Sequence, residues 1–156
     1  MFRTIVWATD GSELSDGALP LVEELARTHG GRIVAVHADA LLTGRFGGAS
    51  LLADEDDVRV KLARQVQELR EAGFEAELKI KASPMLAPAQ ILAEAAREVE
   101  ADVIVVATHA YGVVGSMFFG SVARALVHDA PCPVLSIPPT RARAAEHVPA
   151  TAAVAT

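Results

Sequence analysis

The chain has 156 residues, of which 51% are apolar and 22% charged, and its formal net charge is −6. This length is typical of a single domain with a core of its own. Binding to nucleic acid requires a basic face, so the acidic balance argues against nucleic acid as the main partner. No apolar run approaches the ~20 residues that span a bilayer, so we expect no membrane association.

Two features favour a cytoplasmic location. The single cysteine, Cys132, cannot form an internal disulfide and fits a reducing compartment. The chain leads from Met1 directly into a strand-like run, so we expect no signal peptide.

Strand-like and helical patterns alternate along the chain. Short runs of β-branched and apolar residues predict strands, and apolar residues three and four apart predict helices between them. The expected elements are a strand over residues 4–9, a helix over 12–30, a strand over 33–38, a helix over 54–72, a strand near a sheet edge over 74–80, a helix over 88–98, a strand over 103–106, a helix from residue 120 and a strand over 134–137.

Local signals mark several of these boundaries. Asp10 and Gly11 break the first strand, and the segment 41–50 carries three glycines and is expected to be mobile. The acidic run 54–57 favours a helix start, as does Pro88 in a first turn. The inner face of the helix over 54–72 is expected to use Val58, Leu62, Val66 and Leu69.

This alternation predicts a three-layer α/β sandwich. Helical crossovers between strands give a parallel sheet with helices on both faces. Ligands of such sheets bind at the carboxyl ends of the strands. Asp10, the loop after Ala38 and the loop after Thr108 should therefore converge on one crevice.

The segment 103–137 predicts an anion site within this crevice. An apolar strand is followed by a loop of small residues, and Gly120 and Ser121 then open an amphipathic helix. The free N–H groups and the dipole of that helix start favour a phosphate.

Each candidate residue also has a purely structural interpretation. Asp10 and the residues after it could form only a turn and a helix cap, and Ser121 could satisfy its own backbone. His109 is expected to be a polar loop residue, and His37 a histidine satisfied within the fold. The five histidines and one cysteine have no metal-ligand spacing, so we expect no metal site.

Common enzyme motifs are missing from the sequence. The chain has no G-x-x-x-x-G-K-[S/T] loop, no G-x-G-x-x-G after the first strand and no G-x-S-x-G elbow. Slow ATP hydrolysis or autophosphorylation of Ser121 stays open, but no residue is assigned as a general base.

Both ends of the domain resemble the universal stress protein family. The matching segments read IVWATDGS at residues 5–12, GSV at 120–122 and APCPVL at 130–135. The resemblance implies a Rossmann-like sheet of strand order 3-2-1-4-5 over residues 1–138. The segment 139–156 has no apolar period and no aromatic residue, so we expect it to be a flexible tail. It also implies ATP binding, a homodimer formed through the last strand, Val134–Ile137, and a regulatory role in the stress response.

The ATP-binding pattern of this family, G-x2-G-x9-G-[S/T], is kept in spacing but altered in two residues. With Gly120 and Ser121 at its end, the first two glycines fall on Ala107 and Ala110. A methyl group at these positions matters little at negative φ, whereas a requirement for positive φ would change the path of the loop.

The resemblance implies a role for each matching residue. Asp10 would face the sugar or adenine, Ala38 would contact adenine through its backbone, and residues 107–110 would form the turn beside the ribose and phosphates. Any Mg²⁺ would be held through the phosphates. The implied nucleotide contacts are Ala8, Thr9, Asp10, Ala38, Ala107, Thr108, His109, Ala110, Gly120, Ser121 and Val122.

Two functions of different class follow from these observations. The first is a regulatory module that binds an adenine nucleotide at Gly120 and Ser121. The second is a dimeric interaction module of the same fold, in which Ala107 and Ala110 have disabled the nucleotide site. An apolar last strand would be an exposed edge, which favours pairing with a second chain in either case.

Overall fold

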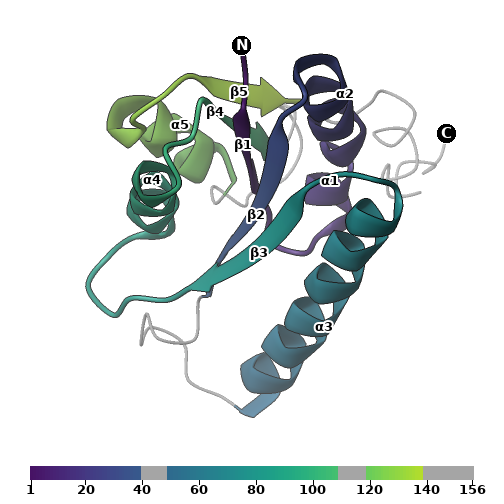
Figure 1. The fold of residues 1–156 in the computed structure, drawn as a ribbon. Coiled ribbons are helices and arrows are strands. Elements are labelled where there is room, and N and C mark those ends of the chain that lie inside the picture. Colours follow the sequence, from purple (N-terminus) through teal and green to yellow (C-terminus); the bar gives the residue numbers. More distant parts are fainter. Residues whose placement is uncertain (40–48, 109–118, 139–156) are drawn as a thin grey trace, which may run out of the picture.

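A five-stranded parallel sheet forms the centre of the molecule in the computed structural model, which describes residues 1–39, 49–108 and 119–138. The strand order is β3-β2-β1-β4-β5, as predicted (Figure 1). The elements are β1 (Thr4–Ala8), α1 (Glu13–Asp16), α2 (Leu19–His29), β2 (Arg32–Ala38), α3 (Ala49–Glu71), β3 (Ala76–Lys81), α4 (Pro88–Glu98), β4 (Val103–Ala107), α5 (Phe119–Asp129) and β5 (Val134–Ile137).

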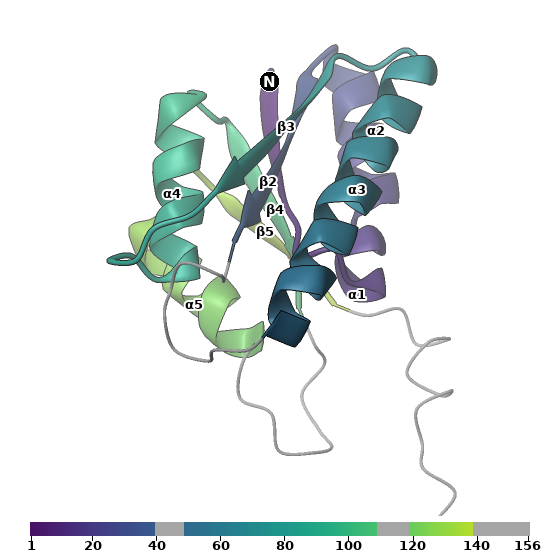
Figure 2. The ribbon, with the colours of Figure 1, turned by 90° about the horizontal axis from the view of Figure 1, so that it is seen from below.

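Helices cover both faces of the sheet and create two apolar layers. Figure 2 shows α4 and α5 on one side and α1, α2 and α3 on the other. Alternate residues of β1 supply the two layers: Ile5 and Trp7 pack with α2 and α3, and Val6 and Ala8 pack with α4 and α5. All five residues of β1 are buried, because this strand is central and covered on both faces.

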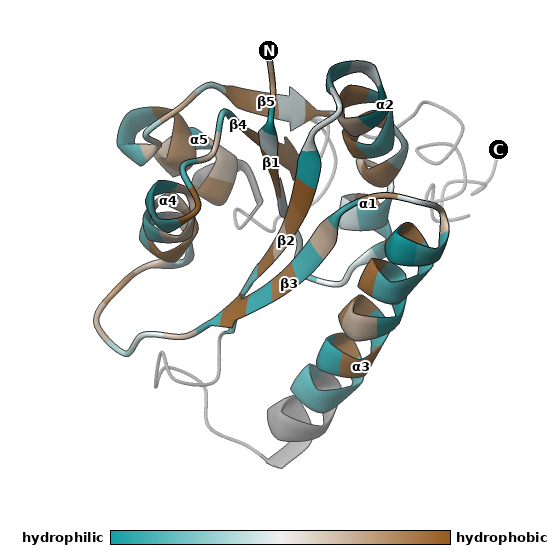
Figure 3. Ribbon diagram, viewed as in Figure 1, coloured by the Kyte–Doolittle hydropathy of each residue, from teal (hydrophilic) through white to brown (hydrophobic). Residues whose placement is uncertain are grey.

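The distribution of apolar and hydrophilic residues agrees with these two layers. In Figure 3 the strands at the centre of the sheet are mostly apolar, and α3 carries hydrophilic and apolar residues on different sides. The predicted inner face of α3 is confirmed, because Leu62, Val66 and Leu69 are buried and Val58 packs partly buried against the same layer. Burial of a leucine or valine side chain contributes about 1.5–3 kcal/mol, so this stripe fixes the helix on the sheet.

The prediction of one helix over 12–30 was wrong, because the structure has two. The helix α1 ends at Asp16, and α2 begins at Leu19 with Pro20 in its first turn. Proline has no N–H to donate to the carbonyl of Asp16, and its ring would crowd that carbonyl in a continuous helix. The predicted end is confirmed, since Gly30 caps α2 in the left-handed conformation with φ 61°.

Two other helices begin earlier than predicted. The helix α3 begins at Ala49, so the acidic run 54–57 lies inside it instead of at its start. Residues 49–53 include two alanines and two leucines, which are strong helix formers, and their propensity outweighs the glycines before them. The helix α5 begins at Phe119, one residue before Gly120. The predicted strands and the helix over 88–98 are confirmed within one or two residues of their bounds.

Asp102, just before β4, anchors the beginning of β1. Its Oδ2 atom accepts hydrogen bonds from the backbone N–H groups of Thr4 at 2.9 Å and Arg3 at 2.7 Å. These bonds lower the pKa of Asp102 below its ordinary value, because they favour the charged carboxylate. The carboxylate therefore stabilises the fold above its unfolded-state pKa, and this contribution is lost as the pH falls.

We predict that Asp102→Asn lowers the melting temperature at neutral pH by a few degrees. The difference from wild type should shrink as the pH falls below about 4, where the wild-type carboxylate also loses its charge. Thermal unfolding of both proteins at neutral and at acid pH measures the difference in melting temperature at each pH. An equal difference at the two pH values would show that the charge of Asp102 does not contribute.

Candidate functional site

The candidate site lies at the carboxyl edge of the sheet, where the strand order reverses. From β1 the chain proceeds outward through β2 to β3 and then returns to the other side of β1 as β4. The loops after β1 and β4 therefore lead to opposite faces, and the crevice between them is where such sheets bind ligands. Ala8 pairs with Val36 of β2 and with Val106 of β4, so the ends of these three strands meet at this edge.

Thr9 is part of the frame of the site. It is buried, and its backbone N–H donates to the carbonyl of Val36 at 3.0 Å. Its Oγ1 lies 2.9 Å from the hydroxyl of Ser15 and accepts from the N–H of Gly11 at 3.1 Å. The side chain of Thr9 thus shapes the turn after β1.

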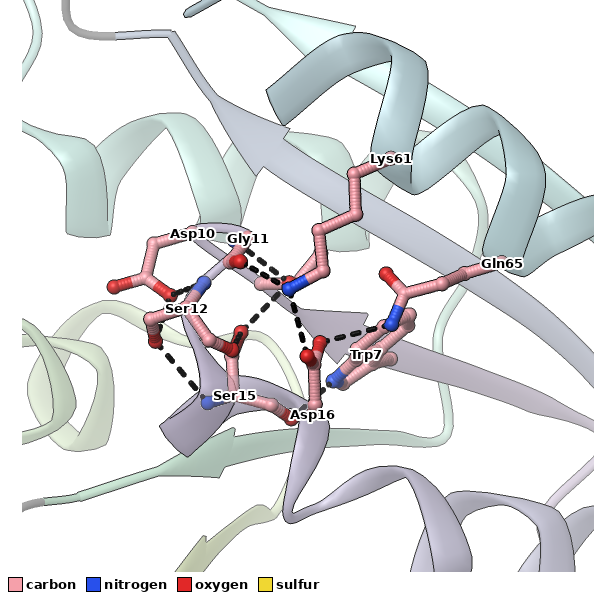
Figure 4. Close-up of polar contacts among 9 residues, drawn as sticks. Trp7, Asp10, Gly11, Ser12, Ser15, Asp16, Lys61 and Gln65 are labelled. Atoms are coloured by element: carbon pink, nitrogen blue, oxygen red, sulfur yellow. Dashed lines mark hydrogen bonds and ion pairs between the residues drawn. The ribbon is translucent and has the colours of Figure 1, made fainter. Parts of the chain in front are cut away.

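Asp10 is held in a fixed orientation at the edge. Its Oδ1 accepts from the N–H of Ser12 at 3.0 Å and from the Ser12 hydroxyl at 2.6 Å (Figure 4). Ser12 is in turn the N-cap of α1, and its hydroxyl accepts from the N–H of Ser15. The cap interpretation is therefore confirmed. The second oxygen of Asp10 has no hydrogen bond to the described part of the chain, so it can accept from a ligand.

A lysine of α3 holds the same turn, which the sequence did not predict. The Nζ of Lys61 donates to the carbonyl of Gly11 and, at 2.7 Å, to the carboxylate of Asp16 (Figure 4). Gln65, one turn along α3, donates to the other oxygen of Asp16 at 2.9 Å. The only sequence signal was the spacing of Lys61 and Gln65, which places both on one side of the helix.

Gly11 is required in this turn for two reasons. Its φ of +76° is in the left-handed region, and a Cβ atom there would lie 2.8 Å from Cγ1 of Val58. The turn after β1 is thus packed tightly beneath α3, and the position of Asp10 is fixed by the core.

Ala107 adopts a conformation that suits alanine. It is the last residue of β4, pairs with Ile137 of β5 and is 5% exposed. Its side chain packs in the apolar layer that includes Trp7 and Val105. Among the non-glycine residues that the structure describes, only Glu100 has a positive φ. The methyl group of Ala107 therefore causes no backbone strain.

The structure places most of the other predicted nucleotide contacts at the ends of strands or at the start of α5. Ala38 is half-buried at the end of β2, and Thr108 is half-buried after β4, where its N–H donates to Ile137 at 2.8 Å. Val122 packs partly buried between α5 and the sheet. Gly120 and Ser121 lie in the first turn of α5. His109 and Ala110 lie outside the described residues, as do the segments 40–48 and 139–156.

The start of α5 lies at the same edge for topological reasons. Because β4 and β5 are parallel, the helix that connects them must return from the carboxyl edge to the amino edge of the sheet. The first four N–H groups of a helix have no partner within it, so those of residues 119–122 are available at this edge of the sheet.

Within the described ranges, no group of three or more histidine, cysteine or acidic residues could hold a metal ion. No helix in those ranges is long and apolar enough to span a bilayer.

A family model described as the universal stress protein family matches residues 1–138. The chain belongs to the universal stress protein family. A curated relative, the universal stress protein in the QAH/OAS sulfhydrylase 3'-region of Thermus aquaticus, is 33% identical over 139 residues. This match covers 88% of the present chain and 99% of the relative. The predicted resemblance is confirmed.

Solved structures of the family share the fold. A universal stress protein from Archaeoglobus fulgidus is 27% identical with a TM-score of 0.67, and the match covers 88% of this chain and 98% of that one. A universal stress protein from the same organism in complex with dAMP is 26% identical with a TM-score of 0.63, again over 88% and 98%.

Proposed function

We propose that this protein binds an adenine nucleotide, ATP in particular, at the carboxyl edge of the sheet and acts as a regulatory stress-response protein. The observation that carries the proposal is the reversal of strand order between β1 and β4, since parallel sheets of this kind bind ligands where the order reverses. The complex of a related universal stress protein with dAMP supports adenine nucleotides as the ligand class.

Residues at the carboxyl edge of the sheet can contact the sugar, the base and the phosphates of a nucleotide. The free oxygen of Asp10 accepts from a ribose hydroxyl, and the backbone of Ala38 contacts adenine. The N–H groups of Gly120, Ser121 and Val122 bind the phosphates, which the positive end of the α5 dipole also favours. Ala107 and Thr108 lie beside the ribose and phosphates, and Mg²⁺ binds through the phosphates.

Ala107 favours nucleotide binding over the ligand-free alternative. Its side chain packs in the core, so at this position the methyl group points into the sheet layer with α1–α3. We predict that Ala107→Gly changes nucleotide affinity less than about twofold and lowers the free energy of unfolding by about 1 kcal/mol. Titration calorimetry and urea unfolding measure the two effects. An affinity gain of tenfold or more would mean that this methyl group obstructs the site.

Calorimetric titration with ATP·Mg²⁺, ADP and AMP tests the proposed function. The protein is first denatured and chromatographed to show that it carries no co-purified nucleotide. We expect saturable binding of one nucleotide per chain, because the strand order reverses once in the sheet. Absence of binding at millimolar concentrations of all three ligands, with empty protein, would leave the interaction module as the function.

We also propose that two chains pair through β5. This strand is at the end of the sheet, and its outer edge has no partner in the described part of the chain. Leu135 is 37% exposed on this short apolar strand. Exposed edges of this kind are commonly covered by pairing with another chain.

Leu135→Lys is expected to convert the dimer into a monomer, since a charged side chain on an edge opposes pairing. Light scattering after size-exclusion chromatography measures the mass of each variant. Val60→Lys, which changes an exposed valine on α3, is the matched control and should stay dimeric. A wild-type protein that is monomeric at micromolar concentration would contradict the proposed dimer.

A further inference from the structure

Lys61 of α3 binds two acceptors beside the turn after β1 (Figure 4). Its Nζ donates to the carbonyl oxygen of Gly11 and, at 2.7 Å, to Oδ2 of Asp16. The Nε2 of Gln65 donates to Oδ1 of the same carboxylate at 2.9 Å. The side chains of Lys61 and Asp16 are 30% and 27% exposed, so the pair is partly shielded from solvent. Asp16 thus holds the ammonium group of the lysine in place against the Gly11 carbonyl.

The helix that carries Lys61 is itself fixed to the end of β2. The Nε2 of His37, a residue that is 4% exposed, lies 3.0 Å from Oε2 of Glu55. One turn further along α3, the guanidinium of Arg59 binds the buried carboxylate of Asp39. These two contacts hold the helix at the carboxyl edge of the sheet. The position of the lysine relative to the turn is therefore set by the packing of α3.

The carbonyl of Gly11 and the N–H of Ser12 belong to one peptide group. A trans peptide group is planar and directs these two groups in opposite directions, so a bond that fixes the carbonyl also fixes the N–H. That N–H donates to Oδ1 of Asp10 at 3.0 Å. A continuous chain of hydrogen bonds therefore leads from Lys61 through this peptide group to the carboxylate of Asp10.

Gly11 does not restrict this peptide group by itself. A residue without a Cβ atom has unusual freedom in φ and ψ, so its neighbouring peptide groups need other partners. The peptide group before Gly11 has one, because the Gly11 N–H donates to Oγ1 of Thr9 at 3.1 Å. The peptide group after Gly11 is held at its carbonyl by Lys61. Without the lysine, this second peptide group is free to rotate away from Asp10.

We propose that Lys61 is a positioning residue of the nucleotide site, which orients the Asp10 carboxylate toward the ribose through the peptide group between Gly11 and Ser12. This inference rests on the proposed nucleotide function, in which the free oxygen of Asp10 accepts from a ribose hydroxyl. A hydrogen bond to a carboxylate is strong only in good geometry, so a rotated Asp10 binds the ribose less tightly. The effect of Lys61 on affinity therefore requires the ribose hydroxyls to be present.

Lys61→Met removes the donor and keeps an unbranched side chain of similar length. Methionine is a strong helix former, so α3 should persist. Lys79→Met is the matched control, because it removes the same positive charge from β3. Lys79 pairs with Val36, whose side chain lies in the layer of α4 and α5, so this lysine projects to the face of the sheet opposite α3.

Calorimetric titration of nucleotide-free protein with ATP·Mg²⁺ and with dideoxyATP·Mg²⁺, which lacks the ribose hydroxyls, tests the functional step. We expect the wild type and Lys79→Met to bind ATP about tenfold more tightly than dideoxyATP. In Lys61→Met this ratio should fall to about twofold, since the Ser12 hydroxyl still donates to Asp10. A general loss of charge or stability would weaken both ligands alike and leave the ratio unchanged.

The two ligands also separate this inference from the nucleotide function. An unchanged ratio in Lys61→Met, or equal affinity of the wild type for ATP and dideoxyATP, would overturn the role of Lys61 while leaving nucleotide binding in place. Failure of every protein to bind either ligand would instead refute the nucleotide function and with it the role of Lys61 in the site.

Exchange of the Ser12 amide proton with water, measured by NMR in the ligand-free protein, tests the structural step. We expect this exchange to be at least about threefold faster in Lys61→Met than in the wild type, because the peptide group leaves Asp10 more often. Lys79→Met should exchange at the rate of the wild type. Equal rates in all three proteins would overturn the inference, whether or not a nucleotide binds.

Discussion

Replacing Gly120 with valine and Ser121 with alanine together is expected to weaken ATP binding by at least about tenfold and to leave the fold intact. Both residues lie in the first turn of α5, where backbone N–H groups have no partner within the helix. A helical side chain covers the turn before its own Cα, so the branched valine would cover these N–H groups. The alanine removes the hydroxyl group as a further donor.

Stability and a conservative variant serve as controls for this result. Valine has a higher helix propensity than glycine, so α5 should persist, and thermal unfolding should show a melting temperature near that of the wild type. Ser121→Thr keeps a hydroxyl and every N–H group, and its affinity should stay within a few-fold of the wild type. An unchanged affinity in the double variant would place the phosphates elsewhere.

Trp7→Ala is expected to lower the free energy of unfolding by about 3–5 kcal/mol, the largest effect on stability predicted for this chain. Trp7 lies in the central strand, is 0% exposed and packs with α2 and α3. Its Nε1 also donates to the carbonyl of Ser15 at 3.1 Å (Figure 4). Alanine would leave a large cavity and a buried carbonyl without that donor.

One further variant separates the hydrogen bond from the packing of the ring, and a second serves as a control at an exposed position. Trp7→Phe keeps an aromatic ring but removes the donor, so we expect a smaller loss, of about 1–3 kcal/mol. Val60→Ala removes two methyl groups from a side chain that is 70% exposed, and should change stability by less than about 0.5 kcal/mol. Urea unfolding measures all three. A loss below about 1 kcal/mol in Trp7→Ala would contradict the central role of this residue in packing.

The layers could be predicted because strand-like and helical patterns alternate locally along the sequence. The strand order could be predicted because the residues at both ends of the domain resemble a family with that order. The division of the first helix could have been predicted as well. Pro20 was the signal, but the apolar stripe after it suggested one continuous helix. The acidic run 54–57 predicted the start of α3 too late, because the alanines and leucines of residues 49–53 extend the helix toward its N-terminus.

The contacts that hold the site could not be predicted from sequence. Lys61 and Asp16 are 45 residues apart, and His37 and Glu55 are 18 apart, so their pairing depends on how α3 packs on the sheet. The effect of alanine at position 107 also required the structure, because the sequence does not give a φ angle or the direction of a methyl group. In the structure the residues of β4 alternate between the two apolar layers, and this alternation directs the methyl group of Ala107 toward α1–α3.

Amide chemical shifts of the nitrogen-15-labelled protein, recorded as ATP·Mg²⁺ is added, test the central claim most directly. The proposed site predicts that the largest changes occur at Thr9 and Asp10, at Ala107 and Thr108, and at residues 120–122. Changes concentrated at the amino ends of the strands, or no saturable change at millimolar ATP in nucleotide-free protein, would contradict a nucleotide site at the carboxyl edge of this sheet.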